Sequence, residues 1–176
     1  MKRSHKVISL DNLPDIPGGT SLLFDTNIFI YWALDHPRFG DSCENCIHRV
    51  EAGEIKGIIP SVVANELLHR MMIAELIGNG WAHTGQEAVN LLKHDATIIR
   101  KLSKAWDMHR ELTRMHFVVL DPYQGITGDT YTLSKKYALL ASDAAILSYA
   151  QKYSIGNLAT NDADFSRVDG LTCWKP

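Results

Sequence analysis

Short apolar runs of β-strand character alternate along the chain with longer segments of helical character, and this alternation limits the fold more than any other feature. The expected strands are residues 21–24, 55–60, 116–120 and 157–160, with 171–174 as a candidate final edge strand. When helices of ten or more residues separate the strands, consecutive strands run parallel and helices cover both faces of the sheet. We therefore expect an α/β protein, a three-layer α/β/α sandwich with a central, mainly parallel sheet of four to five strands.

Capping and stop signals set the expected helix boundaries. Asp41, with Glu44 three residues later, resembles a capping box, so a helix is expected to begin there. Ser61 is a good N-cap for the next helix and Gly78 a good stop. Residues 86–114 carry apolar side chains at helical spacing and predict one long helix or two. The other expected helices are 127–140 and 142–153.

Length and the distribution of breaker residues define the expected domain organisation. A chain of 176 residues suits one domain. Two prolines and two glycines fall between positions 14 and 19, where they interrupt regular structure. Residues 1–19 are therefore expected to form an N-terminal arm or linker, and residues 20–176 a single domain.

Composition excludes several classes of protein. The net charge of -2, from 18 Lys and Arg against 20 Asp and Glu, produces no global basic field, so any contact with nucleic acid must be local. The N-terminal apolar region is too short for a signal peptide, and no window approaches the roughly 18 apolar residues of a membrane helix. Three cysteines agree with a reducing compartment. We expect a soluble, cytoplasmic protein without a membrane partner.

Four acidic residues stand at the junctions between expected elements. Asp25 follows the first strand, Glu66 lies early in the next long helix, Asp143 opens a helix, and Asp162 follows the fourth strand. Taken singly, each has an ordinary structural explanation as a helix cap, an Asx turn or an exposed helical acid. In an open parallel sheet, however, such positions converge on one crevice, where the carboxylates would repel one another unless a cation neutralised them. Oxygen ligands of this kind suit Mg²⁺ or Mn²⁺.

Four segments carry a resemblance to a known family. In order, "LLFDTN", "SVVANELL", "ASDAAILSYA" and "LATNDADF" resemble the signature segments of PIN-domain nucleases, in particular toxins of the VapC type, and the match spans residues 20–174. The resemblance implies a PIN-like sandwich and a metal-dependent endoribonuclease. It identifies Asp25, Glu66, Asp143 and Asp162 as the catalytic acids that bind one or two Mg²⁺ or Mn²⁺ ions. It also implies an RNA substrate, a cognate antitoxin protein and a homodimer.

Polar neighbours are expected to support the acids. Asn27 and Thr26 would orient Asp25 through hydrogen bonds, and Thr160 and Asn161 stand in the same relation to Asp162. The sequence also offers Asp164 as a substitute for Asp162 as the fourth acid. The motif favours Asp162, because Phe165 fits the closing apolar position of the family.

A locally basic stretch, residues 98–116, is a candidate surface for RNA phosphates, with Trp106 available for stacking if it is exposed. The alternative is an ordinary solvated helix face with Trp106 in the core. The candidate RNA-binding residues are Arg70, Arg100, Lys101, Lys104, Arg110 and Arg114.

Two features depart from compact toxins of the family and leave alternatives open. The chain between Glu66 and Asp143 is longer, and the arm before residue 20 is additional. The protein could therefore be a stand-alone RNA-processing nuclease, or a catalytically inactive PIN-like module that binds RNA or a protein partner. The intact acidic set favours an enzyme, because a scaffold has no reason to keep four mutually repelling carboxylates together.

Overall fold

A parallel six-stranded sheet forms the centre of the computed structural model, which describes residues 11–176. The strand order is β1-β6-β5-β2-β3-β4, and every neighbouring pair is parallel. The strands are β1 (Asp11–Asn12), β2 (Ser21–Phe24), β3 (Lys56–Pro60), β4 (Val118–Leu120), β5 (Asn157–Ala159) and β6 (Thr172–Lys175). The parallel sheet is as expected, and its sixth strand is the two-residue β1.

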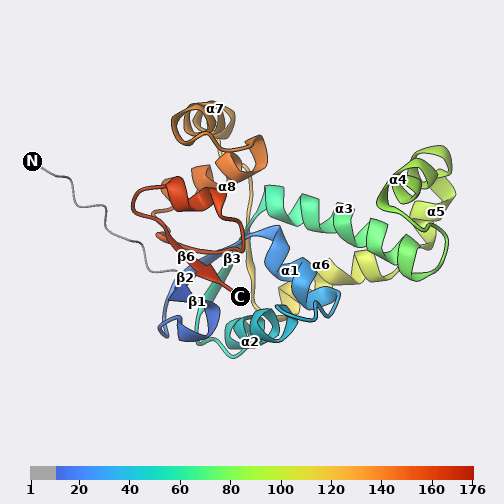
Figure 1. The fold of residues 1–176 in the computed structure, drawn as a ribbon, viewed down its shortest axis with the longest axis horizontal. Coiled ribbons are helices and arrows are strands. Elements are labelled where there is room, and N and C mark those ends of the chain that lie inside the picture. Colours follow the sequence, from blue (N-terminus) through green and yellow to red (C-terminus); the bar gives the residue numbers. More distant parts are fainter. Residues whose placement is uncertain (1–10) are drawn as a thin grey trace, which may run out of the picture.

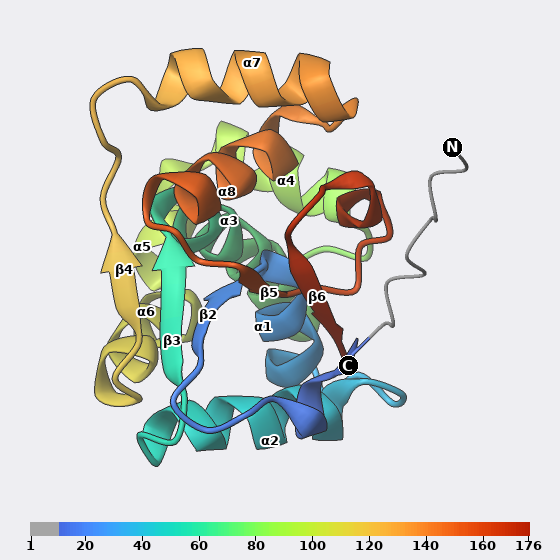
Figure 2. The ribbon, with the colours of Figure 1, turned by 90° about the vertical axis from the view of Figure 1, so that its left-hand side faces the viewer.

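Helices lie on both faces of this sheet. They are α1 (Thr26–Ala33), α2 (Gly40–Glu51), α3 (Ser61–Gly78), α4 (Gly85–His94), α5 (Ala96–Lys101), α6 (Lys104–Arg114), α7 (Ile126–Tyr137) and α8 (Ala141–Lys152), with two short 3-10 helices, η1 (Leu13–Asp15) and η2 (Asp164–Arg167). The chain steps from β2 to β3 and β4 in one direction and then returns to β5 and β6 on the other side of β2. Right-handed crossovers then place α7 and α8 opposite α1 and α2, as Figures 1 and 2 show. The predicted three-layer α/β/α sandwich is confirmed.

The change of direction between β2 and β5 creates the position at which a site can form. Loops leave the carboxyl ends of these two adjacent strands toward opposite faces of the sheet, which opens a crevice between them. Both the Asp25 and the Asp162 segments begin at this edge.

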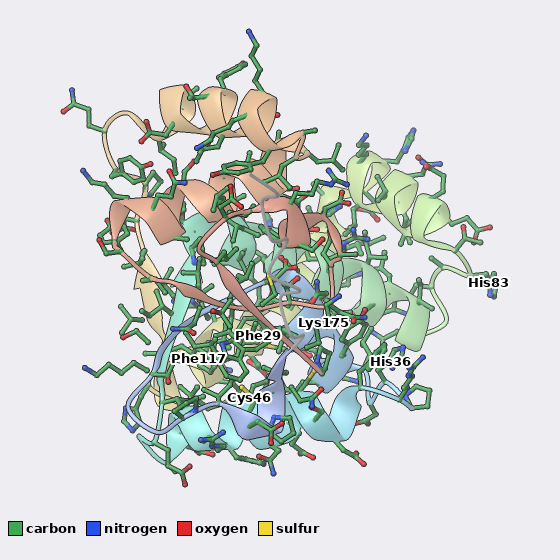
Figure 3. The ribbon with its side chains drawn as sticks, turned by 60° about the vertical axis from the view of Figure 1, so that its left-hand side comes forward. Phe29, His36, Cys46, His83, Phe117 and Lys175 are labelled. Atoms are coloured by element: carbon green, nitrogen blue, oxygen red, sulfur yellow. The ribbon has the colours of Figure 1, made fainter. Side chains whose placement is uncertain are left out.

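An aromatic cluster anchors β2 and α1 in the core. The rings of Phe24, Phe29 and Phe117 are 5.1 to 5.5 Å apart between centroids, and the first two side chains are fully buried. Figure 3 shows Phe29 and Phe117 in the interior of the molecule. Gly57 of β3 lies against this cluster, and a Cβ atom there would come within 2.5 Å of the Phe117 ring and 2.7 Å of Val50. The position therefore requires glycine for space.

Helices α3 to α6 form an extension that projects from the sheet. α3 leads away to α4 and α5, and α6 returns along α3 (Figure 1). Glu75 of α3 is 6% exposed and accepts hydrogen bonds from the backbone N–H groups of Ser103 (2.8 Å) and Ala105 (3.0 Å). Burial alone would raise the pKa of Glu75, but these bonds outweigh it and hold the pKa below its usual range. Glu75 thus caps α6 from another helix.

Several sequence-based boundaries are wrong. Residues 86–114 form the three helices α4, α5 and α6 rather than one or two. The capping box at Asp41 is not formed, because α2 begins at Gly40 and no side chain caps it. Ser61 is not an N-cap, because Pro60 holds that position and the Ser61 hydroxyl bonds the Tyr149 hydroxyl at 2.7 Å.

Two further differences concern the sheet edge and the chain after β2. The strand expected at 171–174 is not at an edge, since β6 pairs with both β5 and β1. Residues 26–33, for which no helix was expected, form α1. The segment reaches the core as a helix and not as an extended chain, and it buries Ile28 and Phe29 there.

Part of the predicted arm packs on the domain. Residues 1–10 lie outside the described residues, but Leu13 and Ile16 are buried, and Arg49 of α2 donates to the Ile16 carbonyl at 2.6 Å. The division of the chain at residue 19 stays a prediction. Within residues 11–176, every helix is too short or too polar to cross a bilayer.

Candidate active site

A cleft of 280 Å³ opens where β2 and β5 end, and acidic side chains dominate it. Asp25 comes from the end of β2, Glu66 from the second turn of α3, Asp143 from the first turn of α8, and Asp162 from the segment after β5. The other lining residues are Thr26, Asn27, Ile30, Tyr31, Arg70 and Ser142. The structure thus brings together the four acids that were expected to form the site.

Asp25 is held by three hydrogen bonds and is only 8% exposed. It caps α1, and its carboxylate accepts from the Thr26 N–H at 2.6 Å, from the Thr160 hydroxyl at 2.6 Å, and from the Asn27 amide. Burial raises the pKa of Asp25 to about 6; the bonds from Thr160 and Thr26 oppose the rise, and the nearby acids Asp143 and Glu66 add to it. The carboxylate of Asp25 is therefore held in place by hydrogen bonds, but these bonds do not fully offset the cost of burying its negative charge.

Polar side chains join the ends of β2 and β5. The side-chain oxygen Oδ1 of Asn27 accepts from the backbone N–H of Asn161 at 3.2 Å, and the side-chain amide of Asn161 donates to the Tyr31 hydroxyl at 3.1 Å. The Thr160 hydroxyl, which donates to Asp25, also accepts from the Asp162 N–H at 3.0 Å. One hydroxyl group therefore fixes the relative positions of the backbone at Asp162 and the carboxylate of Asp25.

Glu66 and Asp143, the acids of the cleft that come from α3 and α8, have weaker hydrogen-bond support than Asp25. Glu66 accepts from the Thr26 hydroxyl at 3.2 Å and lies 3.5 Å from the guanidinium of Arg70, one turn further along α3. Ser142 donates to Asp143 at 3.5 Å. Burial raises the pKa of Asp143, and the carboxylates of Asp162 and Asp164 raise it further.

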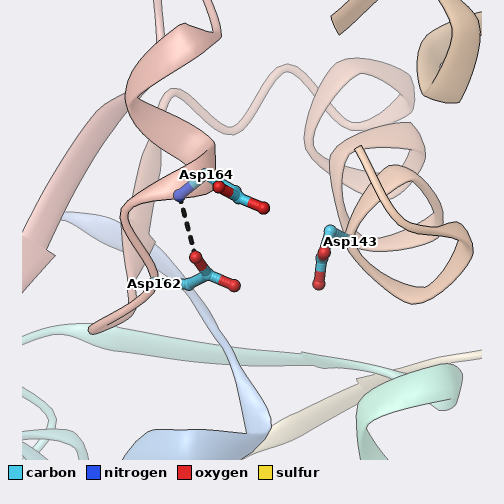
Figure 4. Close-up of side chains that lie close together, drawn as sticks. All are labelled: Asp143, Asp162 and Asp164. Atoms are coloured by element: carbon cyan, nitrogen blue, oxygen red, sulfur yellow. Dashed lines mark hydrogen bonds between the residues drawn. The ribbon is translucent and has the colours of Figure 1, made fainter. Parts of the chain in front are cut away.

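Asp164 also belongs to the acidic cluster. One carboxylate oxygen each from Asp143, Asp162 and Asp164 lie within 4.8 Å of one another. In Figure 4 the side chains of Asp162 and Asp164 point toward Asp143 across the gap between η2 and α8, and the Asp164 N–H donates to Asp162 at 2.8 Å. Asp164 differs from Asp162 in two respects: it does not line the cleft, and it forms an ion pair with Arg167.

The donor set fits a hard divalent cation. The acids offer only oxygen atoms, and among residues 11–176 no cysteine or histidine lines the cleft. Arg70 is the only basic lining residue in that range, and its side chain is 59% exposed. Four carboxylates with one partial counter-charge would gain strongly from Mg²⁺ or Mn²⁺ between them.

The predicted basic surface lies elsewhere in the molecule. Arg70 lines the cleft, whereas the other basic candidates are on or beside α5 and α6, outside it. Those residues are Arg100, Lys101, Lys104, Arg110 and Arg114. Two of them pair with acids of their own helix, Arg110 with Asp107 and Arg114 with Glu111. Trp106 is 41% exposed rather than buried. Contact of this surface with RNA stays a prediction.

Three lining residues were absent from the expected site: Ile30, Tyr31 and Ser142. Ser142 precedes Asp143 directly, so its position could have been inferred from its neighbour. Tyr31 lies four residues after Asn27, which places both on one face of α1. That signal is readable only once residues 26–33 are assigned to a helix.

Comparison with known proteins agrees with this geometry. The model of the PIN domain family matches residues 22–171, which include all four cleft acids. The chain belongs to the PIN domain family. Within it, the protein is 32% identical over 150 residues to ribonuclease VapC2 of Methanocaldococcus jannaschii, a match that covers 85% of this chain and 90% of that relative.

Solved structures show the same PIN domain fold at low sequence identity. VapBC2 from Rickettsia felis, bound to a DNA fragment from its promoter, superposes with a TM-score of 0.56 at 19% identity, covering 89% of this chain and 99% of the other. A toxin-antitoxin complex from Klebsiella pneumoniae gives a TM-score of 0.50 at 22% identity, covering 86% and 95% of the two chains. These likenesses concern the fold.

Proposed function

We propose that this PIN domain is a metal-dependent endoribonuclease that hydrolyses RNA phosphodiester bonds with Mg²⁺ or Mn²⁺, and that it is the toxin of a toxin-antitoxin pair. The observation that carries the proposal is the convergence of Asp25, Glu66, Asp143 and Asp162, from four separate elements, on one cleft. The ribonuclease relative, at 32% identity over most of both chains, favours RNA as the substrate.

The four acids would hold one or two divalent ions. When bound, such an ion activates water for attack on the phosphate and stabilises the negative charge that develops there. The hydrogen bonds from Thr26, Asn27 and Thr160 would fix the Asp25 carboxylate before the ion arrives, which lowers the cost of ordering the site.

Substrate contacts would come from the exposed side of the cleft. Arg70 presents a mostly exposed guanidinium beside Glu66, where it can donate to a phosphate oxygen next to the scissile bond. Cleavage of this type would leave a 5′-phosphate and a 3′-hydroxyl. RNA binding by the α5 and α6 surface would be a second contact, at a distance from the chemistry.

The proposed partners are an antitoxin protein and a second copy of this chain. The similar chains from Rickettsia felis and Klebsiella pneumoniae come from a VapBC assembly and a toxin-antitoxin complex, and their nearly complete coverage favours the same biological setting. Light scattering of the purified protein would measure the dimer. Growth arrest on expression, relieved by the product of a neighbouring small gene, would establish the toxin role.

The test of the enzyme is cleavage of a mixed RNA pool by the purified chain in Mn²⁺ or Mg²⁺, beside an EDTA control. Asp25→Asn should abolish cleavage. The matched control is Asp121→Asn, because Asp121 also follows a strand, β4, but is exposed and lies outside the acidic cleft.

Two results would contradict the proposal. Cleavage that persists in EDTA would exclude the metal role, and cleavage that is unchanged in Asp25→Asn would exclude the cleft. Metal-dependent cutting without growth arrest would favour a stand-alone nuclease over a toxin.

A further inference from the structure

Arg167 connects the two sides of the acidic cluster. It is the last residue of η2, three positions after Asp164, with which its guanidinium forms an ion pair. A second nitrogen of the guanidinium, Nη1, donates to the backbone carbonyl of Ala138 at 2.7 Å. One planar group therefore binds the segment after β5 and, at the same time, the turn between α7 and α8.

The turn that Arg167 reaches is fixed to the end of α7 and continues into α8 through Leu140, the N-cap of α8, whose carbonyl accepts from the Ala144 N–H at 2.9 Å. Ala138 ends α7 in the left-handed conformation with φ of 52°. The next residue, Leu139, is tied to Ser134 in both directions: its N–H donates to the Ser134 carbonyl at 3.2 Å, and its carbonyl accepts from the Ser134 hydroxyl at 2.7 Å. Asp143 follows within the first turn of α8. A displacement of this turn would therefore move Asp143.

The ion pair itself contributes little to the stability of the fold. The side chains of Arg167 and Asp164 are 46% and 38% exposed, and pairs in such positions are weakened by solvent and salt. The contact that spans the two sides is the bond from Arg167 to the Ala138 carbonyl, which joins η2, the segment after Asp162, to the turn that leads into α8 and Asp143. The fork of the guanidinium suits this task, since two fixed N–H directions hold two partners at once.

We propose that Arg167 is a positioning residue for the metal site, and that Asp164 is its anchor rather than a metal ligand. The inference rests on the proposed function, because it assumes an ion held by Asp143 and Asp162. Two observations separate the two acids: Asp162 lines the cleft, whereas Asp164 does not and has its carboxylate engaged by Arg167.

The first test is calorimetric titration of the full-length protein with MnCl₂, comparing the wild type with Arg167→Lys. Lysine keeps the positive charge but not the planar fork, so the comparison isolates geometry. Loss of a group that orients metal ligands typically costs about 10- to 100-fold in metal affinity, and we expect a loss of at least about tenfold here. Arg114→Lys is the control, since Arg114 pairs with Glu111 on the distant α6.

Arg167→Met distinguishes a positioning role from a simple counter-charge, because the two roles predict opposite changes in Mn²⁺ affinity. Removal of a positive charge beside an acidic cluster should strengthen Mn²⁺ binding if Arg167 were only a counter-charge. A positioning role predicts weaker binding, with little change in the thermal unfolding midpoint of the metal-free protein. Circular dichroism at the titration temperature checks that each variant is folded, and Arg167→Lys carries the test if Arg167→Met does not fold.

The role of Asp164 is tested by two amide substitutions. Asp164→Asn keeps an oxygen for the guanidinium and should weaken Mn²⁺ binding far less than Asp162→Asn. Equal losses would show that Asp164 is a ligand, and unchanged affinity in Arg167→Lys would overturn the positioning role. In both cases the proposed function stands if the wild type binds Mn²⁺ and cuts RNA, whereas a wild type that binds no Mn²⁺ overturns both proposals.

Discussion

In the metal-free protein, the free energy of unfolding of Asp25→Asn relative to that of the wild type should increase as the pH rises. The pKa of the buried Asp25 carboxyl is raised to about 6 from 3.8. Its protonated form is therefore favoured by folding, so the contribution of Asp25 to stability is fully present below about 3.8 and is lost as pH rises through about 6. Asparagine does not titrate, so the substitution removes this loss.

The size of the effect follows from the shift. One pKa unit corresponds to about 1.4 kcal/mol, so the wild type loses about 3 kcal/mol over the whole range, of which about 2 kcal/mol falls between roughly pH 4 and 7.5. The asparagine amide also leaves a donor facing the Asn27 amide, at a cost of about 1 to 3 kcal/mol that does not depend on pH. The informative quantity is therefore the change with pH of the difference between the two proteins.

Urea unfolding followed by circular dichroism in EDTA, from pH 4 to 8, measures this difference. The free energy of unfolding of Asp25→Asn, less that of the wild type, should increase by about 2 kcal/mol across roughly that range. Asp121→Asn provides the general effect of deleting one carboxylate outside the cleft. If the difference in the free energy of unfolding between the two proteins stays constant with pH, or falls as pH rises, then folding does not raise the pKa of Asp25.

Three other substitutions test hydrogen bonding in the helical extension, packing in the core and hydrogen bonding in the cleft. Glu75→Gln should destabilise the protein by about 2 to 3 kcal/mol in urea unfolding at neutral pH, because glutamine offers one neutral oxygen where the carboxylate accepts through both of its oxygens, which leaves one N–H facing an NH₂ group. Since the pKa of Glu75 is lowered, its contribution should disappear as pH falls, and a pH-independent cost would contradict this. Gly57→Ala should cost about 1 to 3 kcal/mol in the same assay, because the new methyl group would collide with the Phe117 ring; an unchanged midpoint would show that the ring can move. Thr160→Val should weaken Mn²⁺ binding about tenfold by calorimetry, since the hydroxyl that orients Asp25 is lost, and undiminished affinity would contradict that role.

The sequence predicted the sheet and the positions of the acids because both depend on local patterns. Buried strands are recognised as apolar runs, and Asp25 and Asp162 each follow one, so both could be placed at the same edge of the sheet from the expected parallel direction of the strands. The resemblance to PIN domains used the same residues, and the family match confirms it.

The errors arose where a distant residue decides the local structure. Glu75 caps α6 from 28 residues away, which divides a stretch that reads as one or two helices. Serine is a common N-cap residue, but the hydroxyl of Ser61 bonds the Tyr149 hydroxyl rather than a backbone N–H of α3. The preference for Asp162 over Asp164 came from the motif and stays a prediction; the contact of Arg167 with the Ala138 carbonyl, which bears on it, cannot be inferred from the local sequence.

The central place of β2 in the sheet determines when during synthesis the site can exist. Asp25 enters the chain early, but the hydroxyl that orients it belongs to Thr160, 135 positions later, and β5 must emerge before it can pair with β2. Contacts of such long sequence separation carry a large loop-closure entropy, which slows their formation. An unfinished chain therefore contains Asp25, Glu66 and Asp143 without the element that joins them into a cleft. For an enzyme proposed to cut RNA, fragments released by interrupted translation would be inert, and the ribosome would nearly complete the chain before a competent site exists.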